Sequence, residues 1–302
     1  MNSTYGNTPL PKRYLATLLL VLSLVGSACH SKDDSISAPV ALPASLIGTW
    51  QVAEVHADQG NAHWSGTKED KYNIYKFLGR VFVLTPQHLT TNAPRDKRCD
   101  TPKIIVHHTT AGRVVETSIA SRPLAMARPT PKDFQLPLSD DAPVEVLSLI
   151  CKDGPYVGNL GGGLNPNVGI DGAWIIVLNK EQLALRWNDE TILILSHLVD
   201  NTKPVASFDC AKAATDLEKT ICGSVALAAY DQSVAQTYKF AMEYYKTKKT
   251  ATVQLDELKK SQKQWLTRRN ACNTDKTCLE KSMGDRIEKI DHEIALYGYD
   301  NQ

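Results

Sequence analysis

The sequence has no apolar run long enough to cross a bilayer. Its main apolar stretch, Leu15–Val25, is well short of the ~20 residues that a membrane-spanning helix needs. An excess of charge of one sign is also missing, because 34 lysines and arginines face 33 aspartates and glutamates. A chain with this balance is not built to bind polyanions, so we exclude nucleic acid as a partner.

Motifs of catalysis and metal binding are absent as well. The sequence contains no G-x-S-x-G, no H-E-x-x-H, no C-x-x-C and no Gly-Lys-Ser/Thr of a phosphate loop. A Ser-His-Asp triad is recognised by geometry, so the scattered serines and histidines predict nothing by themselves. We therefore expect no catalytic residue, no metal site and no cofactor, and a protein that is not an enzyme.

The N-terminus has the pattern of an exported protein. Lys12 and Arg13 precede the apolar stretch, and small residues then lead to Cys29. A basic start, a short apolar run and small residues are typical of a secretory signal peptide, predicted here at residues 1–28. The following cysteine resembles that of a bacterial lipobox, although Gly26 stands where leucine is usual. Residues 29–45 are predicted to be a lipidated Cys29 and a polar tether.

Lipidation would decide where the protein lies. Several acyl chains on Cys29 would hold it firmly in a membrane. His30 follows this cysteine, and in the lipoproteins that the chain resembles a residue other than aspartate favours sorting to the outer membrane. We expect a periplasm-facing lipoprotein of the outer membrane, with a soluble periplasmic or secreted protein as the alternative.

Six of the seven cysteines remain after Cys29 is set aside. An even number of cysteines in an exported chain predicts a disulfide framework. Proximity along the chain favours the pairs Cys99–Cys151, Cys210–Cys222 and Cys272–Cys278. The first pair follows by exclusion, and a crossed arrangement, Cys210–Cys278 with Cys222–Cys272, stays open.

Residues 46–200 read as β structure. Short runs of β-branched and aromatic residues are separated by turn-forming residues. The runs are TWQVAEV, YNIYKF, RVFVLT, KIIVHH, RVVETSI, VEVLSLI, AWIIVL, QLALRW and TILILS. They suit an antiparallel barrel or sandwich. Gly48-Thr49-Trp50 resembles the G-x-W at the start of lipocalins, which implies a lipocalin-like domain and, as one hypothesis, a carrier of a small apolar ligand.

Residues 204–300 read as helices. Apolar residues recur at intervals of three and four in three series, which begin at Val225, Leu255 and Leu279. Thr215-Asp-Leu-Glu218 is a capping box that predicts a short fourth helix. The fold class is therefore α+β with two domains, a β-barrel or sandwich followed by a disulfide-bonded all-α domain.

The helical part resembles a known family. F-D-C-A-x-A-x-T-x-x-E-x-x-I-C starts at Phe208, L-x-x-Y-D ends at Asp231, and Q-x-x-W-L-x-x-R-x-x-C runs from Gln262 to Cys272. These segments resemble the LprI-type lysozyme-inhibitor domain, over about a third of the chain. The resemblance implies an exported helical domain and, more loosely, inhibition of lysozyme. Tyr230 departs from the pattern, because the family usually has leucine there.

Two sets of charged and aromatic residues are candidate site residues. Among the signature residues, which include Gln262, we expect Trp265 in the core. We expect Glu218, Asp231 and Arg269 to be ion-pair partners between helices, with contacts to a partner protein as the alternative. A basic run contains Lys259, Lys260, Lys263 and Arg268. It is either a solvated face or a surface that enters a lysozyme cleft, where two catalytic carboxylates would attract a cation.

The leading hypothesis is a lysozyme or muramidase inhibitor that plugs the enzyme's cleft. Two alternatives stay open, an immunity or scaffold protein that binds another periplasmic protein, and the lipocalin-like carrier. Ser65–Tyr72 faintly resembles the inhibitory loop of a different, β-barrel class of lysozyme inhibitors, and is more simply a polar hairpin loop.

Overall fold

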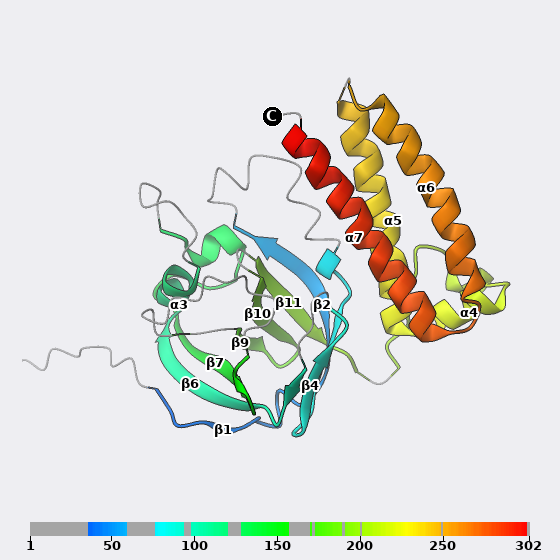
Figure 1. Ribbon diagram of the computed structural model, residues 1–302. Coiled ribbons are helices and arrows are strands. Elements are labelled where there is room, and N and C mark those ends of the chain that lie inside the picture. Colours follow the sequence, from blue (N-terminus) through cyan, green and yellow to red (C-terminus); the bar gives the residue numbers. More distant parts are fainter. Residues whose placement is uncertain are drawn as a thin grey trace, which may run out of the picture. The chain divides into compact units, whose positions relative to one another are not determined.

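The computed structural model describes residues 36–58, 76–93, 98–119, 128–156, 170, 173–188, 191–199, 201–248 and 250–300. Contacts group Asp33–Gln302 into one compact unit. All long strands precede all long helices, so the protein is α+β as expected (Figure 1). In the described residues no helix is both long and apolar enough to cross a membrane.

The strands form one antiparallel sheet. They are β1 (Val40–Ala41), β2 (Gly48–Ala57), β3 (Val81–Leu84), β4 (His88–Thr91), β5 (Cys99–Asp100), β6 (Lys103–Thr110), β7 (Pro143–Cys151), β8 (Gly154–Pro155), β9 (Trp174–Asn179), β10 (Gln182–Asn188) and β11 (Thr191–His197). Their order is β1-β6-β7-β9-β10-β11-β2-β3-β4-β5, with β8 beside β7. Consecutive strands are mostly neighbours, and the pairing of β11 with β2 brings the two ends of the strand-rich segment together.

The sheet curls into a half-barrel that a disulfide helps to close. Its hydrogen-bonded path ends at β1 on one side and β5 on the other. The Cys99–Cys151 disulfide ties β5 to β7, and the Lys152 N–H donates to the Asp100 carbonyl at 3.0 Å. The expected barrel or sandwich is therefore a curled sheet whose last opening is bridged covalently.

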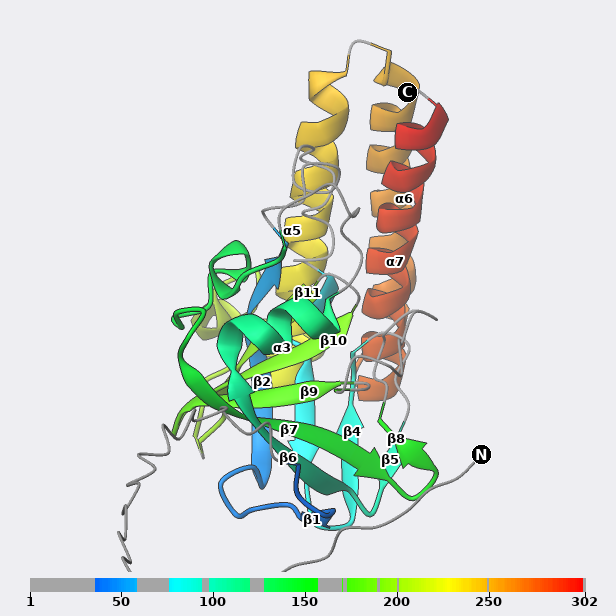
Figure 2. The ribbon, with the colours of Figure 1, turned by 90° about the vertical axis from the view of Figure 1, so that its left-hand side faces the viewer.

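Alternating residues of the strands build two cores. Ile175 and Leu193 point into the enclosed core with Trp50 and Trp187, whereas the neighbouring Ile176 and Ile194 belong to a second core on the other face. The helix α3 (Ala111–Ser118) and the 3-10 turn η2 (Pro131–Phe134) cover that second core (Figure 2). Both faces of the sheet thus contribute to a buried core.

Most of the expected strands are present, but the prediction of a strand was wrong for one run. The run RVVETSI forms the helix α3, with Thr110 as its N-cap. Val114, Val115 and Ser118 are buried along one side of this helix, and Ser118 accepts a hydrogen bond from the Trp174 indole at 3.0 Å. Tertiary packing thus overrides the β-propensity of the valines. In the run YNIYKF, Lys76 and Phe77 lie in a helical turn and the other residues fall outside the described chain.

The C-terminal part contains the expected helices. They are the 3-10 turn η4 (Cys210–Lys212), α4 (Asp216–Cys222), α5 (Val225–Thr247), α6 (Thr252–Ala271) and α7 (Lys276–Asp300). The long helices α5, α6 and α7 pack side by side (Figure 1). Their apolar residues form two clusters, one around Trp265 and Met283 and the other around Tyr244 and Ile294.

Several predictions concern residues outside the described chain. They are the signal peptide at 1–28, Cys29 with its lipidation, and the loop Ser65–Tyr72. The boundaries of the tether, the β-rich domain and the helical domain at 29–45, 46–200 and 204–300 also stay predictions. The last described strand ends at His197 and the first helical turn starts at Cys210.

Candidate functional site

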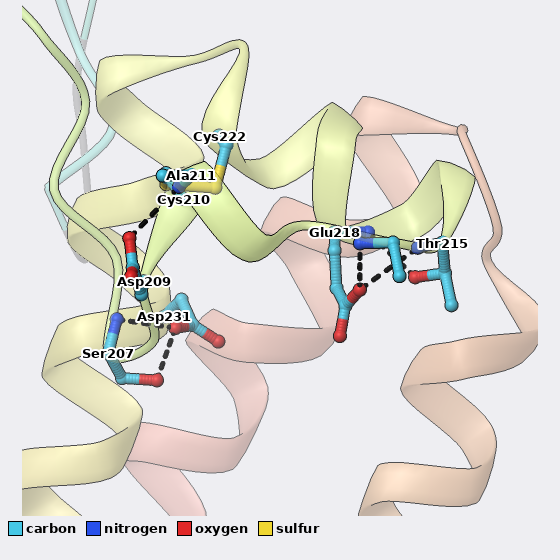
Figure 3. The surroundings of a disulfide bond; sticks show 9 residues. Ser207, Asp209, Cys210, Ala211, Thr215, Glu218, Cys222 and Asp231 are labelled. Carbon is cyan, nitrogen blue, oxygen red and sulfur yellow. Dashed lines mark hydrogen bonds between the residues drawn. A yellow bond between two sulfur atoms is a disulfide. The ribbon is translucent and has the colours of Figure 1, made fainter.

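A capping box and a disulfide hold the short helix α4 (Figure 3). Thr215 accepts a hydrogen bond from the Glu218 N–H, and the Glu218 carboxylate accepts from the backbone N–H of Ala214 and Thr215 at 2.8 and 2.9 Å. These two bonds hold the pKa of Glu218 below its usual value. The Cys210–Cys222 disulfide fastens the end of α4 to η4.

Asp231 lies at the centre of the helical part. It is 4% exposed, and its carboxylate accepts hydrogen bonds from the Ser207 N–H at 2.9 Å and from the Ser207 hydroxyl (Figure 3). Its second oxygen pairs with the Arg269 guanidinium at 3.2 Å. Asp231 therefore joins the segment before η4, the helix α5 and the helix α6.

Arg269 and Trp265 extend this contact along α6. The guanidinium lies 5.2 Å from the centre of the Trp265 ring, and burial lowers the pKa of Arg269 although Asp231 and Glu218 raise it. Trp265 is buried, as the sequence predicts, and its indole N–H donates to the Ser282 carbonyl on α7 at 3.0 Å.

Gln262 completes the link between α6 and α7. Its carbonyl oxygen accepts a 2.8 Å hydrogen bond from Arg286, which is 3% exposed and also reaches Ser261. Like Arg269, Arg286 has a pKa lowered mainly by burial. The signature side chains from Asp231 to Arg269 are therefore engaged inside the helical part.

The basic run behaves differently, because its side chains are exposed on the surface of α6. Lys259 pairs with Asp256 at 3.1 Å and Lys260 with Glu257 at 3.6 Å, each within one helical turn. Lys263 and Arg268 are exposed and have no ion pair within the described part of the chain. We call this surface, Lys259, Lys260, Lys263 and Arg268, the α6 face.

The strand-rich part contacts the other two long helices. Arg80, fully buried, lies 3.3 Å from the centre of the Tyr230 ring and donates to the Ser233 hydroxyl at 2.8 Å. The Tyr230 hydroxyl donates to the Asn92 carbonyl at 2.6 Å. On α7, Asp291 pairs with Lys76 at 3.6 Å. These contacts fall on α5 and α7, so the α6 face is turned toward solvent.

Sequence reasoning missed these contacts. Arg80 and its helical partners are some 150 residues apart, and Arg80 stands in an ordinary strand-like run. The one available signal was Tyr230, the departure from the family pattern. In this chain its ring and hydroxyl contact the strand-rich part, which a leucine could not do through a hydrogen bond.

Among the described residues no group of three or more His, Cys, Asp or Glu side chains could hold a metal ion. Hydrogen bonds engage Glu218 and Gln262, and an ion pair, a cation–aromatic contact and two disulfides engage the other signature residues.

A comparison with protein families gives one match. Residues 210–293 match the family model described as lysozyme inhibitor LprI. The comparisons with curated proteins and with solved structures found no match. The matched residues run from η4 into α7 and include the two disulfides of the helical part. Residues 210–293 therefore form a domain of the LprI lysozyme-inhibitor family.

Proposed function

We propose that this protein binds and inhibits lysozyme or a related muramidase, and that the α6 face enters the enzyme's cleft. The observation that carries the proposal is the LprI-type domain, in which Lys263 and Arg268 of α6 are exposed and have no ion pair among the described residues. The protein acts by steric plugging and performs no chemistry of its own.

Electrostatics supports this choice of face. A muramidase cleft contains two carboxyl groups that cleave the glycosidic bond. A cation brought between them in a water-poor interface gains charge-assisted hydrogen bonds. Lys263 and Arg268 need not break an internal ion pair to do this, whereas Lys259 and Lys260 have acidic neighbours on their own helix.

The first test is a titration of the full chain, produced in an oxidising compartment, into c-type, g-type and i-type lysozymes that digest cell walls. We expect saturable inhibition of at least one type. An unchanged rate at high molar excess against all three would refute the function.

Charge reversal then tests the face. Lys263→Glu with Arg268→Glu should weaken inhibition by at least tenfold. Lys239→Glu, at an exposed lysine of α5, is the matched control and should leave inhibition within about twofold. Equal inhibition by the double variant would keep the function and reject the α6 face.

We also propose that Cys29 anchors the protein at the outer membrane, facing the periplasm. The support is the basic, apolar and small-residue pattern before this cysteine. Cys29→Ala should move the protein from the membrane fraction to the soluble fraction. A membrane-bound Cys29→Ala variant would contradict lipidation at this residue.

The alternatives receive less support. The enclosed core of the strand-rich part holds Trp50, Trp187 and Phe82 where a carrier would hold its apolar ligand. An immunity or scaffold role fits the same exposed face, and it becomes the leading hypothesis if no lysozyme is inhibited.

A further inference from the structure

A pocket of about 320 Å³ opens between the strand-rich part and α7. Lys76, Asn92 and Ala93 line it on one side, and Tyr230 of α5 borders it. The remaining lining residues belong to α7: Thr277, Glu280, Lys281, Gly284, Asp285, Ile287 and Glu288. We call this the junction pocket. It is separate from the α6 face, since no residue of α6 lines it.

The wall formed by α7 has a gap at its centre. Glu280, Gly284 and Glu288 follow one another at intervals of four, so they share one side of the helix. A Cβ atom at Gly284 would lie 3.7 Å from the Tyr230 ring, which is ordinary contact. Internal packing therefore does not demand glycine, although glycine inside a helix costs about 0.5–1 kcal/mol relative to alanine. Because Gly284 has no side chain, the pocket stays open between the side chains of Glu280 and Glu288.

The charges around the junction pocket do not balance. Lys281 pairs with Asp285 at 2.8 Å, and Lys76 pairs with Asp291 at 3.6 Å. Among the residues that line the pocket, three are acidic, Glu280, Asp285 and Glu288, and two are basic, Lys76 and Lys281, so one negative charge remains. Glu288 is exposed and forms no ion pair among the described residues.

The uncharged groups at the pocket also favour a hydrogen-bond donor. Because the Tyr230 hydroxyl donates its proton to the Asn92 carbonyl at 2.6 Å, its oxygen is left to accept. One face of the Tyr230 ring is already covered by Arg80 at 3.3 Å. The ring is therefore a poor platform for stacking a sugar, and the pocket offers acceptors rather than a flat apolar surface.

We propose that the junction pocket binds one cationic group, an alkylammonium or alkylguanidinium, between Glu280 and Glu288 over Gly284. The group is carried either by a lysine or arginine side chain of a partner or by a small free amine. The site does not depend on the α6 face or on muramidase inhibition, so each proposal can fail alone.

The test follows backbone amide NMR signals of the full chain at pH 7.5, with n-butylammonium and ethylguanidinium as probes. Acetate is the anionic control. We expect saturable shifts centred on Gly284 and Tyr230 with both cations and none there with acetate. Shifts that spread evenly over exposed acidic residues would overturn the proposal.

Substitutions test separately whether the charge and the shape of the junction pocket are needed for cation binding. Glu280→Gln with Glu288→Gln should weaken cation binding at least fivefold, and Gly284→Met, which fills the gap without changing charge, should do the same. Glu243→Gln, at an exposed carboxylate of α5, is the control and should bind as the unaltered protein does. Undiminished binding in the first two variants would refute the site.

A final arm identifies the source of the cation. A neutral peptide that contains a single lysine is compared with n-butylammonium. Tighter binding of the peptide supports a protein partner, and equal binding supports a small amine. If neither shifts Gly284, the site is rejected.

Discussion

Asp231 is the single residue whose loss should damage the helical part most. Its side chain is 5% exposed and pairs with an Arg269 side chain that is 14% exposed. Asp231→Asn would leave the buried guanidinium without its carboxylate, and breaking one side of a buried pair costs about 3–5 kcal/mol. We expect the free energy of unfolding, measured with urea, to fall by about 3 kcal/mol.

The control for this change is Asp256→Asn on the surface of α6. Asp256 pairs with Lys259, but its side chain is 70% exposed. Exposed pairs contribute at most about 1 kcal/mol. Similar losses for both variants would mean that the Asp231–Arg269 pair is not a special support of the fold.

Asp291 should make stability depend on pH. Burial raises the pKa of its carboxyl to about 6, although Lys76 lowers it. An unfolded aspartate has a pKa near ~4, so between these values the folded protein holds a proton that the unfolded chain has released. Stability from this group is complete below pH ~4 and is lost as the pH rises through ~6.

Urea unfolding at several pH values tests this sign. From pH 4 to pH 7 the unaltered protein should lose about 2–3 kcal/mol relative to Asp291→Asn, since each pKa unit corresponds to ~1.4 kcal/mol. Asp285→Asn, at a side chain that is 65% exposed, serves as the control and should show no such difference. A gain of relative stability with rising pH would contradict the burial of Asp291.

At the scale of elements, α4 depends on its covalent fastening. It runs only from Asp216 to Cys222, and so short a helix is marginal by itself. Replacing Cys210 and Cys222 by serine should lower the free energy of unfolding by about 3 kcal/mol, the value expected for a loop of this size. Hydrogen exchange should show α4 opening first. Exchange in α4 that matches α5 in this variant would show that packing alone holds the helix.

The long helices could be predicted because their signals are local. Intervals of three and four predict α5, α6 and α7, and the pair Thr215 and Glu218 predicts the start of α4. The helix α3 could not be predicted in this way. Its valines favour a strand, but in the folded protein they pack in a core with Trp174, a residue far away in sequence.

The residues of the candidate site also fall into two groups, those that the sequence predicts and those that it does not. The sequence predicted correctly that Trp265 is buried and that Asp231 and Arg269 are ion-pair partners between helices. The third expected ion-pair partner, Glu218, instead caps the N-terminus of α4 and forms no ion pair with a described residue. The sequence did not predict Arg80 or the junction pocket. Those features exist only after the strand-rich part has packed against α5 and α7. The residues next to Arg80 in the sequence give no signal of this packing.

At the scale of the whole molecule, the packing of the strand-rich part on the helices should make unfolding cooperative. Gly79 lies at this contact with φ of +76°, and a Cβ atom there would lie 2.4 Å from the Cβ of Ala229. Gly79→Ala should therefore push the two parts away from each other. We expect scanning calorimetry to show one transition for the unaltered protein and two for this variant, one from each part.

Gly154→Ala separates backbone strain from this steric effect. Gly154 also has a positive φ, +120°, but nothing lies within 4 Å of the position of its Cβ. The variant should suffer the backbone penalty, roughly 1 kcal/mol or more, without losing cooperativity. Two transitions in both variants would attribute the effect to strain, whereas one transition in both would show that the contacts of Arg80 and Tyr230 hold the parts together despite the clash. A split seen only with Gly79→Ala would establish the contact at Ala229 as the point where the LprI-type domain is coupled to the sheet.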